Sequence, residues 1–327
     1  MLSLNLQSGD SGHLASQNNA GAGAPGVYLP YMHDTSQVTA WIHKAISLFT
    51  LPSKSIISQY YGSPPRYSYY DGCSTGGAQG FALAQFHPEL FDGIYAGSPG
   101  NWYSHLALSF LWNAAKTQGA AKIEQSLLDS ITGKVLDECD GIDGVKDGML
   151  ENPLKCTFDI NSLACDSSPA NSSTCLTLAQ LEAAKAIYKG PTSSLDGTEL
   201  YPGFSLGSEA SWLSQEGLLA DAFSIPILQN MVFDNLSYDA LEFNWGSDVE
   251  AMDEKVGRYI DEVSTDLSTF RNRGGKMLVT QGMRLISNLQ DRTRLTIPFR
   301  LGRCLQRRHL ANPAPPRPRN LLRWRRL

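Results

Sequence analysis

The chain has 327 residues, of which 42% are hydrophobic and 18% are charged. This composition supplies enough apolar material for a large core and too little charge for a disordered chain. No stretch reaches the roughly 18 to 20 consecutive apolar residues that a bilayer-spanning helix needs, so we expect no membrane partner.

The formal net charge of -5 is distributed unevenly along the chain. Residues 1–283 contain 15 Lys and Arg against 31 Asp and Glu, whereas residues 284–327 contain 12 Arg against one acidic residue. A basic tail of this kind is typical of nucleic-acid binding, and Trp324 lies among its arginines. The acidic body argues against that function, and we expect no nucleic acid as a partner.

The first elements that the sequence predicts are a strand and two helical segments. Leucines alternate with polar residues over 2–6, which favours a strand. Apolar residues recur at helical spacing from 38 to 49, with Asp34 or Thr35 as the N-cap. A second helical segment, 55–61, follows before a glycine and two prolines.

A strand, a helix and a strand come next, at 67–70, 78–86 and 91–97. This order predicts a parallel sheet covered by helices, which is the α/β class. Residues 276–280 read as a further core strand. Between them, residues 104–261 change in character to helices and Cys-rich loops, so we interpret that segment as an inserted lobe.

Residues 72–76, Gly-Cys-Ser-Thr-Gly, match the pattern G-x-S-x-G. This is the pattern of a nucleophile elbow, a strained strand-to-helix turn that exposes the serine hydroxyl. Ser74 is the candidate nucleophile, and the backbone N–H of Thr75 would supply one oxyanion donor at the start of the helix. An ordinary Gly-rich turn between strand and helix is the alternative interpretation.

A serine nucleophile needs a base, usually a histidine that a carboxylate orients. In α/β-hydrolases these residues follow the serine in the order Asp, then His. Of the histidines after Ser74, His87 falls at a helix end and His105 begins the inserted lobe. Only His309 is late enough, and it lies in the Arg-rich tail, so we expect no histidine to serve Ser74.

Residues 139–149, Cys-Asp-Gly-Ile-Asp-Gly-Val-Lys-Asp-Gly-Met, form an acidic loop. Its three aspartates, Asp140, Asp143 and Asp147, are costly in one tight loop unless a cation neutralises them. Calcium accepts carboxylate and backbone carbonyl oxygens together. The spacing is not that of an EF-hand, and a solvated acidic turn is the alternative.

Four of the six cysteines fall within residues 139–175, with no C-x-x-C pair. Local disulfides are therefore a better interpretation than a zinc site, and they indicate an oxidising compartment. Asn171 and Asn235 each begin an Asn-x-Ser triplet, which has the form of a glycosylation acceptor. The N-terminus lacks the basic start and apolar run of a signal peptide, so either the protein is cytosolic or its true N-terminus is missing.

Taken together, these motifs give the chain a resemblance to the fungal tannase and feruloyl esterase family of secreted serine esterases. The resemblance covers roughly residues 1–283. It rests on five stretches: 67–77 (Tyr-Ser-Tyr-Tyr-Asp-Gly-Cys-Ser-Thr-Gly-Gly), 93–99, the loop 140–149, 201–204 and 274–278.

The resemblance implies an α/β-hydrolase sheet with an inserted lid domain. Residues 1–103 and 262–283 would form an incomplete catalytic domain, and residues 104–261 would form the lid with its calcium loop. Residues 284–327 would be an aberrant Arg- and Pro-rich tail, which we expect to be disordered.

The resemblance also assigns residues to sites. Ser74 falls at the family's nucleophile. The structural Ca²⁺ would be held by the side chains of Asp140, Asp143 and Asp147 and by the carbonyls of Val145 and Met149. The lid disulfides would be Cys139–Cys156 and Cys165–Cys175. In the family, the cysteine before the nucleophile pairs with a cysteine directly after the catalytic histidine.

The chain departs from the family after the last predicted strand. Gln281-Gly282-Met283 runs straight into Arg284, where the family has the Asp that orients its histidine. No His-Cys pair occurs in the sequence, so we expect Cys73 to be unpaired. The abrupt gain of Arg and Pro is what translation in a wrong reading frame or through an intron would give. The chain also begins after the position of the family's signal peptide and first strands.

The sequence therefore predicts a secreted carboxylic ester hydrolase that acts on feruloyl or galloyl esters through a serine acyl-enzyme. The partner would be a small phenolic ester or an ester of plant-wall polysaccharide. Activity would be impaired, because the catalytic Asp and His are missing. The alternative is a non-catalytic protein that binds aromatic ligands or plant-wall material.

Overall fold

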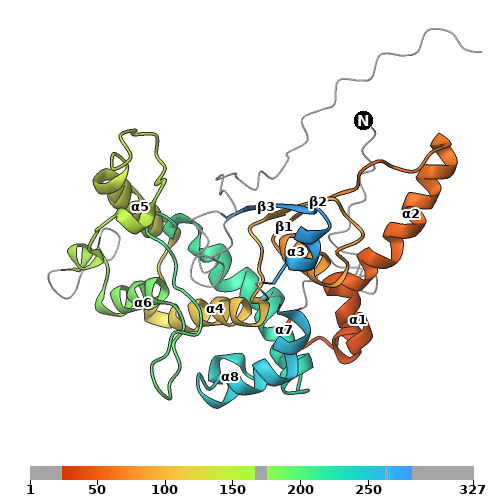
Figure 1. Ribbon diagram of the computed structural model, residues 1–327. Helices are drawn as coiled ribbons and strands as arrows, with labels where there is room; N and C mark the ends of the chain where they lie inside the picture. The colour runs from red at the N-terminus through yellow and green to blue at the C-terminus, as the bar shows by residue number, and fades with distance from the viewer. Residues whose placement is uncertain (1–23, 166–174, 262–263, 265, 282–327) are drawn as a thin grey trace, which may run out of the picture.

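The computed structural model describes residues 24–165, 175–261, 264 and 266–281. The strand predicted at 2–6 and the tail 284–327 lie outside the described residues. In Figure 1 a small sheet occupies the middle of the molecule, with the N-terminal helices on one side and a long helical region on the other. No helix in the described ranges is long and apolar enough to cross a membrane.

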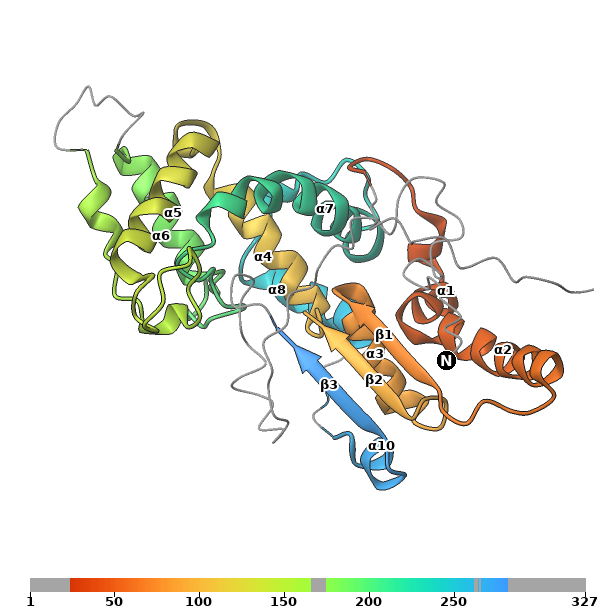
Figure 2. The same cartoon turned by 90° about the horizontal axis from the view of Figure 1, so that it is seen from above.

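Within the described residues, the sheet has three parallel strands in the order β1-β2-β3 (Figure 2). They are β1 (Tyr69–Cys73), β2 (Gly93–Gly97) and β3 (Lys276–Thr280). The predicted parallel sheet is therefore confirmed. Strand β1 extends three residues beyond the predicted end, because Asp71, Gly72 and Cys73 pair with Tyr95, Ala96 and Gly97. This pairing overrides the low strand propensity of Asp and Gly.

Helix α3 (Thr75–Phe86) packs directly on β1 and β2. Its glycines allow a close approach: a Cβ atom at Gly77 would lie 2.6 Å from the Gly97 carbonyl oxygen, and one at Gly80 would lie 3.0 Å from Ile94. The helix starts three residues earlier than the sequence predicted. The two glycines at its start, which are poor helix formers, are buried there against the strands.

One continuous helical run precedes the sheet. It begins at α1 (Thr35–Thr39), whose N-cap Asp34 accepts the Ser36 N–H at 2.8 Å. The run continues through a π-helical segment, Ala40–Lys44, into α2 (Ala45–Tyr61), where the sequence predicted two separate segments. The N-cap could therefore be predicted from the sequence, whereas the continuity of the two helical segments could not.

The regular elements of the described residues between β2 and β3 are helices, which long loops connect. The main elements are α4 (Tyr103–Lys116), α5 (Gln125–Cys139), α6 (Leu178–Lys189), a π-helix (Ser214–Ser224), α7 (Ile225–Ile227), a second π-helical segment (Leu228–Val232), α8 (Ser247–Met252), a third (Asp253–Gly257), α9 (Arg258–Ile260) and α10 (Ser268–Asn272). Short 3₁₀ turns occupy Pro30–His33, Gly119–Ala121, Pro153–Lys155, Ile160–Leu163, Glu209–Ser211 and Ala240–Glu242. Helix α6 opens with a capping box of Thr177 and Gln180.

The two larger hydrophobic cores among the described residues of this helical region are separate. One lies around α5 and α6 and includes the fully buried Trp212. The other combines α4 and residues 225–260 with the N-terminal residues 29–42. The second core therefore ties the N-terminal helices to the helical region. The domain division at residue 104 stays a prediction.

Candidate active site

Ser74 lies between the carboxyl end of β1 and the first turn of α3. Its backbone has φ 59° and ψ -118°, and its side chain is exposed. A positive φ is strained for a non-glycine residue and is typical of functional turns. The Ser74 N–H donates to the Gly97 carbonyl at 2.8 Å, which fixes the turn to β2. This geometry is that of the predicted elbow.

The first glycine of the motif is sterically required. A Cβ atom at Gly72 would lie 2.6 Å from the carbonyl carbon of Gly76 and 2.7 Å from the Tyr70 hydroxyl. At Gly76 the nearest atom would be the Tyr70 hydroxyl at 3.6 Å. The buried Tyr70 hydroxyl donates to the Gly76 carbonyl at 2.8 Å, and burial together with Asp71 raises the pKa of Tyr70. Tyr70 therefore stays protonated and closes the turn.

Thr75 is the first residue of α3. The N–H groups in the first turn of a helix have no intrahelical partner, and they point toward the positive end of the helix dipole. The Thr75 N–H is therefore in the position expected of an oxyanion donor beside Ser74. Its catalytic use stays a prediction.

None of the four histidines in the described ranges bonds to Ser74. His43 Nδ1 lies 2.9 Å from His87 Nε2. His105 lies 2.6 Å from the Leu200 carbonyl and 2.9 Å from Asp253, with its ring stacked on Trp102. His33 contacts Asn230 at 3.2 Å. His309 lies outside the described residues, so the identity of the base stays a prediction.

A half-buried carboxylate that the sequence did not reveal lies at the start of α4. Asp261 accepts the Ser104 backbone N–H at 2.8 Å and the Ser104 hydroxyl at 2.6 Å, so it caps the start of α4. Burial raises the pKa of Asp261 to about 6, against the lowering effect of the Ser104 hydrogen bonds. The cap comes from 157 residues away in the chain, which no local pattern signals.

Two of the expected disulfides are present. The Cα atoms of Cys139 and Cys156 are 5.5 Å apart, and those of Cys165 and Cys175 are 5.1 Å apart. The expectation that Cys73 is unpaired is wrong, because Cys73 is disulfide-bonded. That expectation rested on the missing His-Cys pair, but a disulfide requires only spatial proximity.

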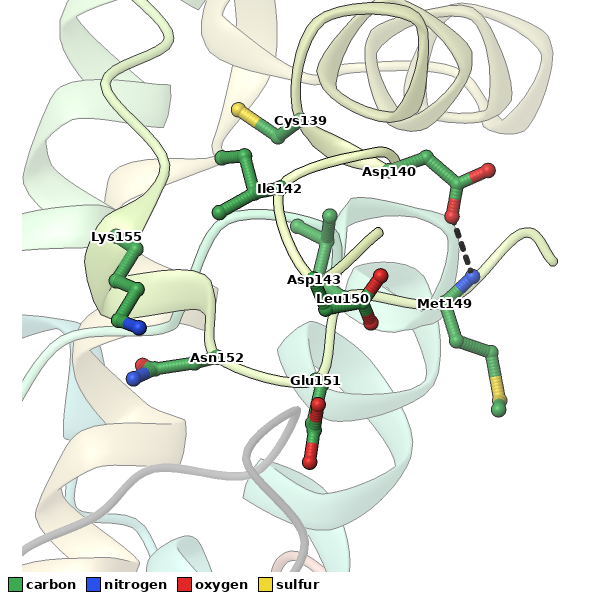
Figure 3. A pocket seen from close by; sticks show the side chains of 9 residues that line it. All are labelled: Cys139, Asp140, Ile142, Asp143, Met149, Leu150, Glu151, Asn152 and Lys155. Atoms are coloured by element: carbon green, nitrogen blue, oxygen red, sulfur yellow. Dashed lines mark hydrogen bonds between the residues drawn. The ribbon is translucent and has the colours of Figure 1, made fainter. Parts of the chain in front are cut away.

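The acidic loop forms a pocket, which Figure 3 shows from close by. Asp140, Asp143 and Met149 line this pocket, as do Glu151 and Asn152, which no sequence motif indicated. Asp147 and Val145 do not line it.

The carboxylates of the loop bond to backbone N–H groups. Asp140 accepts the N–H groups of Gly148 and Met149 at 3.1 Å, and Asp143 accepts that of Val145 at 2.8 Å. Asp147 accepts the Met149 N–H at 3.1 Å. In the described part of the chain, no group of three or more acidic, His or Cys side chains is arranged to hold a metal. The calcium site therefore stays a prediction.

Comparison with known proteins places the chain in a family. The family model described as "Tannase and feruloyl esterase" matches residues 5–288. An uncharacterized esterase of Xanthomonas campestris is 33% identical over 270 residues, which cover 75% of this chain and 46% of that protein. A probable feruloyl esterase B-1 of Aspergillus oryzae is 30% identical over 274 residues, or 81% of this chain and 49% of that protein.

A solved structure agrees with these matches. The crystal structure of feruloyl esterase B from Aspergillus oryzae superposes with a TM-score of 0.71 at 28% identity, covering 78% of this chain and 51% of that one. The chain spans about half the length of the relatives it matches. The family match, the elbow and the shared fold agree. The chain therefore belongs to the tannase and feruloyl esterase family.

Proposed function

We propose that the protein is a carboxylic ester hydrolase for esters of phenolic acids such as feruloyl or galloyl groups. The observation that supports this most strongly is the strained, exposed backbone of Ser74 at the end of β1. Relatives named as feruloyl esterases share this part of the chain, and they suggest the phenolic acyl group. The two disulfides support secretion into an oxidising compartment.

In the proposed reaction, the Ser74 oxygen attacks the ester carbonyl and its proton passes to a base. The Thr75 N–H donates to the oxyanion of the tetrahedral intermediate. The carbon–oxygen bond to the alcohol then breaks, and the alcohol leaves with the proton. Water hydrolyses the resulting acyl-enzyme and regenerates Ser74.

We further propose that turnover by this chain is slow. The histidines of the described ranges are engaged away from Ser74, and Arg284 follows the last strand where the family has its Asp. An exposed serine without a base stays protonated at neutral pH and is a poor nucleophile. Loss of a triad member typically lowers the rate by several orders of magnitude.

We propose calcium as a structural ion of the acidic loop, with the side chains of Asp140, Asp143 and Asp147 and the carbonyls of Val145 and Met149 as ligands. Support comes from the shared pocket of Asp140, Asp143 and Met149, which the Cys139–Cys156 disulfide holds at one end. Each carboxylate has lone pairs beyond those that accept backbone N–H groups. Calcium should raise the melting temperature of the protein, and Asp140→Asn should abolish that rise. An unchanged melting temperature would refute the ion.

The direct test is hydrolysis of methyl ferulate and methyl gallate at high protein concentration. We expect slow release of the free acid, which Ser74→Ala abolishes. Ser98→Ala is the matched control, since Ser98 also has a positive φ (41°) at the end of a neighbouring strand. Equal hydrolysis by Ser74→Ala would refute the proposal. Saturable binding of the free phenolic acids without any turnover would favour the non-catalytic alternative.

A further inference from the structure

The turn 233–238 lies between α7 and α8 and holds one of the two Asn-x-Ser triplets, Asn235-Leu236-Ser237. Backbone contacts fix the turn. The Asn235 N–H donates to the Gln229 carbonyl at 2.8 Å, and the Tyr238 N–H donates to the Asn235 carbonyl at 3.0 Å. Asp234 adopts a positive φ of 49°, which reverses the chain just before Asn235. The turn is therefore well defined.

The side chain of Asn235 is exposed, and only its oxygen is used. Oδ1 accepts the Ser237 N–H at 3.0 Å, whereas Nδ2 makes no hydrogen bond to any described residue. Asn230 is the contrast within the same region. It is buried, and its Nδ2 donates to the carbonyls of Val27 and Pro226 at 3.1 and 3.0 Å. A substituent is therefore tolerated on Asn235 Nδ2, where one on Asn230 would disrupt the fold.

The contacts that stabilise this turn do not involve Asn235 Nδ2. The rings of Phe233 and Tyr238 stack at 4.0 Å between centroids, and the Tyr238 hydroxyl donates to Asp248 at 3.2 Å. Stacked aromatic rings contribute beyond the apolar area they bury. Because these contacts hold the turn, attachment of a group at Nδ2 removes no interaction of the folded protein.

We propose that Asn235 carries an N-linked oligosaccharide. Asn235 Nδ2 would form a bond to the anomeric carbon of the reducing-end sugar of a polyprenyl pyrophosphate-linked oligosaccharide. The bond between that carbon and the pyrophosphate breaks, the lipid pyrophosphate leaves, and the amide nitrogen loses one proton. The inference requires the secretory route proposed above, which the disulfides support, but it does not depend on ester hydrolysis.

The test is to express the full chain behind a cleavable secretion signal in yeast and to treat it with peptide N-glycosidase in heavy-oxygen water. We expect heavy-oxygen aspartate at position 235 in the peptide mass spectrum. Asn235→Gln and Ser237→Ala should each remove one glycan, so that the protein migrates faster in electrophoresis. Ser237→Thr should retain the glycan and the wild-type mobility. Asn171→Gln, which removes the other triplet, isolates the signal of Asn235.

Occupancy is measured in both the cell lysate and the secreted fraction, so that poor folding does not hide it. Modification at Asn235 in secreted, disulfide-bonded protein would support the inference. An unmodified Asn235 in the secreted fraction would overturn it, even if the retained protein were glycosylated. An unmodified Asn235 in both fractions would overturn it as well.

Discussion

Individual residues of the elbow show how sequence and strain are linked. Ser74 tolerates its positive φ because its N–H is bonded to Gly97 and its carbonyl accepts the N–H groups of Gly77 and Ala78, at 2.9 and 3.2 Å. The two glycines of the motif, Gly72 and Gly76, are not equivalent. Of the two, only Gly72 is so close to backbone atoms that an added Cβ atom would overlap them. This difference yields a matched pair of variants.

Gly72→Ala should destabilise the protein by about 1–3 kcal/mol or more, because its methyl group overlaps the Gly76 carbonyl. Gly76→Ala should have little effect, because the atom nearest to its new Cβ would be the Tyr70 hydroxyl oxygen at 3.6 Å. Urea unfolding followed by circular dichroism measures both. Equal destabilisation by the two variants would contradict this account of the turn.

Asp261 should impose a pH dependence on stability. Burial raises the pKa of Asp261 in the folded protein to about 6, above its ordinary value of 3.8. The folded state therefore binds more protons than the unfolded state between about pH 4 and 6, and stability falls as pH rises through that window. The folded and unfolded pKa values of Asp261 differ by roughly two, which corresponds to about 3 kcal/mol of stability lost across this window.

The variant Asp261→Asn carries no titrating group at this position. Compared with this variant, the wild-type protein should lose stability between pH 4 and 6, as urea midpoints at several pH values would show. Parallel profiles would indicate that the carboxyl of Asp261 does not titrate in this range.

At the scale of elements, the 3₁₀ turn Glu209–Ser211 joins α5 to α6 through one carboxylate. Glu209 is fully buried, and it accepts hydrogen bonds from the Thr132 hydroxyl, the Tyr188 hydroxyl and the Gly207 N–H, at 2.9, 2.7 and 2.8 Å. Replacing a buried acceptor leaves its donors unsatisfied, and this costs about 1–3 kcal/mol.

Glu209→Gln should therefore lower the free energy of unfolding by about 1–3 kcal/mol, because the amide nitrogen of the new glutamine would face a group that now donates to the carboxylate. The exposed Glu242 provides the control, and Glu242→Gln should change stability by less than about 0.5 kcal/mol. Thermal unfolding of the two variants compares them. A Glu209→Gln variant as stable as the control would show that the carboxylate is dispensable.

The elements that could be predicted from sequence are those with local signals. The strands at 93–97 and 276–280, the Asp34 cap and the capping box at 177–180 all have short-range patterns, and the structure has them. The elbow was likewise predictable, because G-x-S-x-G is a local steric requirement. The Asp261 cap and the bond of Cys73 were not, since each joins residues that only the folded chain brings together.

At the scale of the whole molecule, the three parallel strands of the described residues support the elbow that carries Ser74. The sheet positions Ser74 at its carboxyl edge, and a shared core ties the N-terminal helices to α4. The described histidines are held by other contacts. We therefore propose that Ser74 is a correctly placed nucleophile that no histidine of the described residues serves.

Phosphonylation of Ser74 by a serine-directed reagent, with and without added imidazole, tests this claim most directly. Without imidazole at neutral pH, we predict only trace labelling of Ser74, in line with its slow ester hydrolysis. Imidazole should act as the missing base and produce an adduct on Ser74, which intact-mass and peptide analysis would locate and which Ser74→Ala would lack. Stoichiometric labelling without imidazole would contradict the account by showing that a base is in place. No labelling under either condition would contradict the placement of Ser74 as a nucleophile.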